Sequence, residues 1–207
     1  MSHKKNIINN QGIPIIKRDS FFNLSICTNQ MESDMKRKAI SLLTVTIFIF
    51  IFIVTSKAMY SSSVIEKIKP AAEDIPAGFV IGQIPGFAKN LLKANPWNFD
   101  HDAIRKMTNR IYPGGEYSKI ADIHMTILAK QKNPFGDDIV CYIFVYRDKK
   151  SADEEIAKLG EFVQYNRDRS ILLEKENLAV YLLVDSVQDF QYIQSMSASI
   201  QKKLDSI

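Results

Sequence analysis

The sequence hypothesis for acid–base or metal chemistry in this 207-residue chain involves three side chains, Asp122, His124 and Glu116. Asp122 and His124 are two residues apart, so on a β-strand they point to the same face. An imidazole beside a carboxylate can begin a metal site, or it can act as a general base that the carboxylate orients. Such a site needs a third member, and Glu116 is a candidate, although no spacing singles it out. This gives one hypothesis, a small periplasmic hydrolase or metal-dependent enzyme using His124, Asp122 and Glu116.

The competing interpretation of Asp122 and His124 is structural. Residues 120–129 alternate apolar and polar side chains, which is typical of an antiparallel strand with one face in solvent. The sequence has no HExxH, paired CxxC, GxSxG or phosphate-binding glycine loop. We therefore expect His124 to lie on a polar, solvent-facing strand surface. The sequence predicts no catalytic residue, no metal site and no cofactor.

A loop over residues 112–117 is the most distinctive local stretch. Aromatic residues flank its Pro-Gly-Gly turn, and Trp97, the only tryptophan, lies shortly before it. Pro-Gly favours a type II turn, so the segment can simply end a helix and lead into a strand. Binding residues, however, are concentrated on loops that a rigid scaffold holds. The functional hypothesis is a ligand-binding lip with Glu116 as its polar anchor, formed by Trp97, Tyr112, Gly114, Gly115, Glu116 and Tyr117.

Hydrophobic periodicity predicts the elements that would position these residues. Asn98 or Asp100 can cap the first helix, and Ser151 to Glu154 form a capping-box signature before another. The predicted order is a helix ending near 111, strands 120–129 and 139–146, a helix of about 152–163, strands 170–174 and 178–184, and a helix of about 186–204. This order predicts an α+β fold, in which a four- to five-stranded antiparallel sheet has helices packed mainly on one face.

The charge balance argues against nucleic-acid binding. The chain has 27 Lys/Arg and 23 Asp/Glu, giving a formal charge of +4. Eight of the basic and three of the acidic residues precede position 59, which leaves 19 basic and 20 acidic residues in 59–207. A nucleic-acid-binding domain needs a basic surface, and this part of the chain is near neutral.

Cysteine usage indicates a domain without an internal disulfide. Cys27 lies in the N-terminal part, and Cys141 lies within the apolar run 139–144. That run is typical of a buried strand, so we expect Cys141 to be an inert core residue.

An uncharged, strongly apolar run over 39–56 follows Lys36, Arg37 and Lys38. A basic start, an apolar centre and the small-x-small sequence Ser56-Lys57-Ala58 are typical of a signal peptide over 35–58. The run is also close to the length of a membrane-spanning helix, so an uncleaved anchor is the alternative, and a buried core helix is a third interpretation. In the two membrane interpretations the downstream part lies outside the cytoplasm, because the basic residues precede the run.

Four regions follow from this organisation. Residues 1–34 are expected to be disordered, or not translated if synthesis starts at Met35. Residues 35–58 are the leader, 59–74 a linker and 75–207 a single domain. The leading functional hypothesis is an exported or membrane-tethered envelope domain with a non-catalytic binding or assembly role. Its expected partner is an envelope protein and not a nucleic acid, and membrane contact is expected only through 39–56, if that segment is retained.

Overall fold

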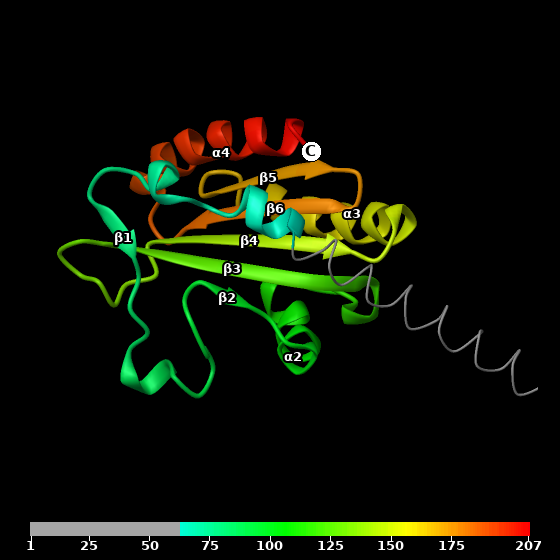
Figure 1. Ribbon diagram of the computed structural model, residues 1–207, viewed down its shortest axis with the longest axis horizontal. Helices are drawn as coiled ribbons and strands as arrows, with labels where there is room; N and C mark the ends of the chain where they lie inside the picture. Colours follow the sequence, from blue (N-terminus) through cyan, green and yellow to red (C-terminus); the bar gives the residue numbers. More distant parts are fainter. Residues whose placement is uncertain (1–62) are drawn as a thin grey trace, which may run out of the picture. The chain divides into compact units, whose positions relative to one another are not determined.

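The computed structural model describes residues 63–207, which are coloured in Figure 1. The predicted N-terminal extension (1–34) and leader (35–58) lie outside the described residues. Within residues 63–207, no helix is both long and apolar enough to cross a membrane. The role of 35–58 in export or anchoring therefore stays a prediction.

An antiparallel sheet of six strands forms the centre of this domain (Figure 1). The strands are β1 (Phe79–Ile81), β2 (Trp97–Asn98), β3 (Ile120–Lys130), β4 (Ile139–Tyr146), β5 (Ser170–Lys175) and β6 (Leu178–Val184). Their order is β1-β3-β4-β6-β5, and β2 also pairs with β3. The predicted α+β class and antiparallel sheet are confirmed. The strands β1 and β2 are too short to show a two-residue period, so the sequence did not reveal them as strands.

Besides the helical residues 63–68, three α-helices of the described part of the chain pack on the sheet, and local capping explains where two of them begin. They are α2 (His101–Ile111), α3 (Lys149–Tyr165) and α4 (Phe190–Asp205), accompanied by the short 3₁₀ helices η2 (Ala72–Asp74), η3 (Gly86–Ala88), η4 (Tyr117–Lys119) and η5 (Val187–Asp189). The Asp100 carboxylate accepts a hydrogen bond from the Ala103 amide at 2.8 Å, so Asp100, and not the alternative Asn98, caps α2. α3 starts earlier than predicted, because the Asp148 carboxylate accepts from the Ser151 amide at 2.7 Å.

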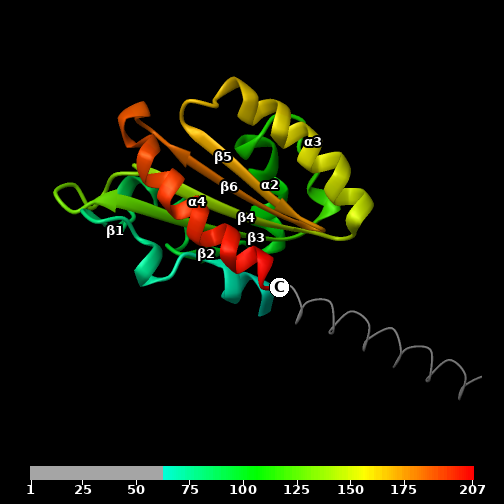
Figure 2. The same cartoon turned by 90° about the horizontal axis from the view of Figure 1, so that it is seen from above.

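Each face of the sheet carries its own hydrophobic core. Alternate residues of β4 supply both cores: Ile139, Cys141 and Ile143 face one, and Phe144 and Tyr146 face the other. α4 and the helical residues 63–68 cover the first face, whereas α2 and α3 cover the second (Figure 2). Helices thus lie on both faces, where the sequence placed them mainly on one. The continuous apolar run of β4 is the signal for this arrangement, because a strand buried on both faces has no polar alternation.

The segment before β1 packs into the domain, although the sequence placed residues 59–74 in a linker. Val64, Ile65 and Ile68 are at most 1% exposed in the core under α4. The buried Asp74 carboxylate forms an ion pair with Lys203 of α4 and accepts a hydrogen bond from Ser199 at 2.5 Å. Burial alone would raise the pKa of Asp74, but hydrogen bonds from these two side chains hold it below its usual value.

Candidate functional site

The loop over residues 112–117 is held by one carboxylate that the sequence did not single out, that of Glu155 on α3. The Tyr112 hydroxyl donates a hydrogen bond to Glu155 Oε2 at 2.8 Å, and the Glu116 backbone amide donates to the same oxygen at 2.9 Å. Lys158 Nζ donates to Glu155 Oε1 at 2.7 Å. Glu155 is fully buried, so these charge-assisted bonds compensate for its lost hydration. The loop therefore has a defined attachment to a rigid helix.

The position of Glu155 follows from the helical repeat of α3. Ala152, Glu155 and Leu159 are spaced by three and four residues, and all three are buried against the sheet. A carboxylate on an otherwise apolar helical stripe is therefore the sequence signal for this contact, because such a group needs buried partners. The capping-box signature at 151–154 predicts only where this helix begins and says nothing about the role of Glu155.

Two glycines give the loop its path from α2 to β3. Gly114 has a φ of +77°, a conformation that L side chains rarely adopt, and its amide donates to Asn109 Oδ1 at 2.8 Å. A Cβ on Gly115 would lie 2.8 Å from Thr108 Cγ2 and 3.0 Å from the Tyr112 ring. The glycines thus serve the backbone turn and its close packing.

A charge network extends from Glu155 to the surface of the loop. The Glu116 carboxylate contacts Lys158 Nζ at 2.9 Å and Lys119 Nζ at 3.0 Å, and Lys119 reaches Glu154 at 2.6 Å. Burial alone would raise the pKa of Glu155, but hydrogen bonds from Lys158, from the Glu116 amide and from Tyr112 outweigh it and lower that pKa. Hydrogen bonds from Lys158 and Lys119 likewise lower the pKa of Glu116. Both carboxylates are therefore ionised at neutral pH.

Two tyrosine hydroxyls at the base of the loop differ in their bonding. Burial raises the pKa of both Tyr112 and Tyr146 above the ordinary tyrosine value. Tyr112 donates to Glu155. The buried Tyr146 hydroxyl has no partner among residues 63–207 that meets hydrogen-bond geometry, and only the neighbouring Tyr112 side chain lowers the pKa of Tyr146 against the effect of burial. The Tyr112 hydroxyl thus contributes to the polar network, and the interaction with Tyr112 compensates only part of the desolvation cost of the Tyr146 hydroxyl.

The residues predicted to form a binding lip divide into a buried and an exposed group. Tyr112 is 0% exposed and Trp97 is 7% exposed, so both belong to the core of this face. Gly114, Glu116 and Tyr117 are exposed, and the Tyr117 ring stands edge-on to the His101 ring at 6.4 Å. The structure thus leaves the exposed part of the loop as the surface that a ligand could touch.

His124 is buried, which corrects the expectation of a solvent-facing strand surface. It is 3% exposed, and its two ring nitrogens have protein partners. Nδ1 lies 2.5 Å from Asn98 Oδ1, and Nε2 lies 2.9 Å from Thr126 Oγ1. Since the amide oxygen only accepts, this arrangement assigns the proton to Nδ1, and Nε2 accepts from the Thr126 hydroxyl. His124 thereby connects β3 to β2.

The environment of His124 keeps the ring neutral. Burial, assisted by the positive charge of Lys69, lowers the pKa of His124 to about 4. Lys69 follows the helical residues 63–68, which cover this face of the sheet. The alternation within β3 shows which residues share a face of the strand. It cannot show that residues 63–68, from a distant part of the sequence, pack on that face, so the prediction of an exposed His124 was wrong.

The proposed enzyme residues are not brought together. Asp122 and His124 share one face of β3, whereas Glu116 bonds to Glu155 and Lys158 of α3 on the opposite side of the sheet. Within residues 63–207, no group of three or more His, Cys, Asp or Glu side chains is placed to hold a metal ion. Cys141 is a free, fully buried thiol, and burial raises its pKa to about 12, as expected of an inert core residue.

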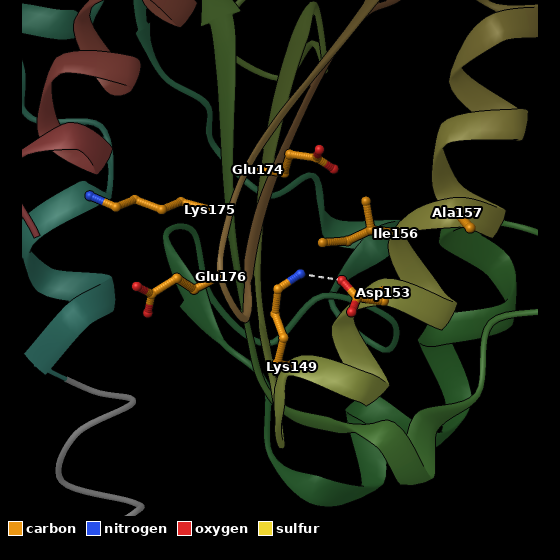
Figure 3. A pocket seen from close by; sticks show the side chains of 7 residues that line it. All are labelled: Lys149, Asp153, Ile156, Ala157, Glu174, Lys175 and Glu176. Atoms are coloured by element: carbon orange, nitrogen blue, oxygen red, sulfur yellow. Dashed lines mark hydrogen bonds and ion pairs between the residues drawn. The ribbon is translucent and has the colours of Figure 1, made fainter.

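A separate hollow of about 370 Å³ lies between α3 and the β5–β6 hairpin (Figure 3). Its walls combine charged and apolar side chains, and Lys149 and Asp153 of α3 form an ion pair on one side. The residues that line it are Lys149, Asp153, Ile156, Ala157, Glu174, Lys175 and Glu176. None of them was singled out from the sequence, because short charged loops and helix ends are usually ordinary solvated surface.

Comparison of the chain with protein-family models, curated proteins and solved structures gives no match. The functional argument therefore rests on the chain's own residues and their geometry.

Proposed function

We propose that the protein is an exported or membrane-tethered envelope domain with a non-catalytic binding or assembly role, and that loop 112–117 is a contact surface. The hydrophobic run 39–56 and its basic flank support the location. The bonding of the loop to the buried Glu155 carboxylate is the observation that carries the binding role.

Attachment to Glu155 matters because flexible loops lose conformational entropy when they bind. A loop already held in one conformation loses less, so more of its contact energy appears as affinity. Here a backbone amide and a tyrosine hydroxyl both reach one buried oxygen, while Glu116 and Tyr117 remain at the surface. An aromatic ring beside paired charges fits a protein surface of mixed polar and aromatic character.

Site-specific photocrosslinking in intact cells tests the contact. A photoreactive residue replaces Tyr117 in the full chain, and the matched control places it at Tyr165 of α3, which is exposed but lies outside the loop. We expect a discrete crosslinked product from position 117 that position 165 does not give. Identical products from both positions, or none from position 117, would contradict the proposal.

The location has its own test, which also separates the two forms of the leader. Sequencing the mature N-terminus should give Met59 if the signal peptide is removed, and an intact 35–58 segment if the protein is anchored. In both cases protease added outside the cytoplasmic membrane should digest the domain. Protection of residues 75–207 until the cells are lysed would overturn the envelope location.

A further inference from the structure

β5 is an edge strand whose outer backbone groups face away from the sheet. Among residues 63–207 it pairs with β6 alone. The Val184 amide donates to Arg169 O at 2.9 Å, which makes these two residues a hydrogen-bonded pair of the ladder. Hydrogen-bonded and non-hydrogen-bonded pairs alternate in antiparallel ladders, so every second residue of β5 points its N–H and C=O outward. These outward residues are Ser170, Leu172 and Glu174.

The edge lacks two of the features that usually prevent strand addition. Its sequence, Ser170–Lys175, contains no proline, and its register with β6 runs without a bulge. Ser170 is buried, but Leu172 is partly exposed and Glu174 is exposed. An unpaired edge of this kind can take up a further strand.

The hollow shown in Figure 3 lies beside this edge, between β5 and α3. Ile156 of α3 and Glu174 of β5 line it from opposite sides. Further along α3, Gly160 faces Leu172 of β5, because a Cβ there would make ordinary van der Waals contact with Leu172 Cδ2, at 3.9 Å. We define the edge groove as the outer side of β5 together with Asp153, Ile156, Ala157 and Gly160.

The charge of the edge groove is unbalanced toward the negative. Lys149 is paired with Asp153, and Lys175 points toward α4, where it donates to Leu204 O at 2.8 Å. Within the described part of the chain, neither Glu174 nor Glu176 forms an ion pair. A bound segment with a cation beside Glu174 would supply the missing charge.

We infer that the edge groove binds an extended segment of a partner protein as an added strand, with Lys or Arg beside Glu174. The inference rests on the proposed binding role and names the kind of partner. Backbone hydrogen bonds to Leu172 and Glu174 would hold the segment, and the side chains on its α3 side would set specificity.

A second copy of this chain fits the same edge less well. In an antiparallel pairing of two β5 strands, outward residues pair with outward residues. Glu174 would then oppose Ser170, Leu172 or another Glu174. Lys175 directs its backbone toward β6, so it would not stand opposite Glu174 in any of these registers. The acidic group would remain without a cation.

The test uses the full 207-residue chain and defined peptides. The first probe is a labelled eight-residue peptide of alternating Val and Lys, and the second has Glu in place of Lys. We expect the Lys peptide to bind at least tenfold more tightly in fluorescence anisotropy. It should also slow hydrogen exchange at the amides of Leu172 and Glu174. Equal affinity for the two peptides would overturn the inference.

Two N-methylated forms of the Lys peptide separate strand addition from simple charge attraction. One carries N-methyl groups on the Val residues, and the other carries them on the Lys residues. An added strand uses the N–H groups of only one set, so one form should lose at least tenfold in affinity and the other should keep it. Equal binding by both forms would contradict strand addition.

Matched variants locate the contact. Glu174→Lys should weaken binding of the Lys peptide about tenfold, whereas Glu161→Lys, on the exposed surface of α3 outside the groove, should leave it unchanged. An equal loss in both variants would overturn the assignment, as would a concentration-dependent dimer that Glu174→Lys abolishes.

If these tests fail while the Tyr117 crosslink persists, the proposed function stands without the edge groove. If the crosslink fails and the peptide data hold, loop 112–117 is not the contact surface.

Discussion

The two faces of the sheet each bury a polar titratable side chain, and they satisfy it in different ways. His124 has neutral partners and a pKa of about 4, so it is buried without charge. Glu155 keeps its charge, because a lysine, a tyrosine hydroxyl and a backbone amide donate to it. His124 joins two strands inside the fold, whereas Glu155 fixes a surface loop. The buried His124 thus stabilises the sheet, whereas the buried Glu155 holds loop 112–117 in place at the surface.

Lowering the pH should reduce the free energy of unfolding, because protonation of the buried His124 is unfavourable in the folded state. This is the largest effect we expect. The folded-state pKa of about 4 lies below the ordinary value of 6.5. Its stabilising contribution is therefore complete above pH 6.5 and is lost as the pH falls from 6.5 toward 4. The free energy of unfolding should drop by about 3 kcal/mol over that range. Urea titrations at a series of pH values measure it.

Two histidine substitutions, a test variant and its matched control, assign this pH effect to His124. His124→Gln should remove most of the slope between pH 6.5 and 4, and His101→Gln, at an exposed position, should retain it. An unchanged slope in His124→Gln would show that other groups cause the acid sensitivity.

Removing the charge of Glu155 should have the next largest effect. Glu155→Gln keeps the shape of the side chain, but its NH₂ group then competes with the donors that surround it. We expect a loss of about 2 kcal/mol in the free energy of unfolding, the typical value for hydrogen bonds to a charged group. Because the pKa of Glu155 is lowered, this loss should be full at neutral pH and should diminish as the pH falls below the ordinary glutamate value. Denaturant titrations at pH 7 and pH 3 check both statements.

The smallest effects come from the two tyrosine hydroxyls, and they should have opposite signs. Tyr112→Phe removes a donor to Glu155 and should destabilise the fold by about 1.5 kcal/mol. Tyr146→Phe removes a buried hydroxyl that meets hydrogen-bond geometry with no group of residues 63–207 and interacts only with the Tyr112 side chain, so it should stabilise the fold by about 1 kcal/mol. Thermal unfolding of the pair measures both. Destabilisation by Tyr146→Phe would show that its hydroxyl is bonded in solution.

Local patterns predicted most of the fold. Asp100, one of the two caps that the sequence offers, marks the start of α2, and the apolar run of residues 139–146 predicted the largely buried strand β4. These features depend on neighbouring residues in the sequence. The covering of His124 by residues 63–68 depends on a contact between distant segments, so alternation within β3 suggested an exposed face instead.

The sequence predicted only one part of the candidate site, because the other part also depends on contacts between distant segments. Loop 112–117 stood out because its aromatic residues flank a Pro-Gly-Gly turn. Glu155, which holds that loop, lies about 40 residues further along, and its hydrogen bonds to Tyr112 and Glu116 have no signature in spacing. Its place on the apolar stripe of α3 was the available signal.

The central claim is that Glu155 fixes loop 112–117 as a contact surface, and crosslinking from position 117 in the Glu155→Gln background tests it most directly. The account predicts that this variant, with its folded state verified by circular dichroism, loses most of the specific crosslinked product while the Tyr165 control is unchanged. A product of undiminished yield in Glu155→Gln would contradict the claim.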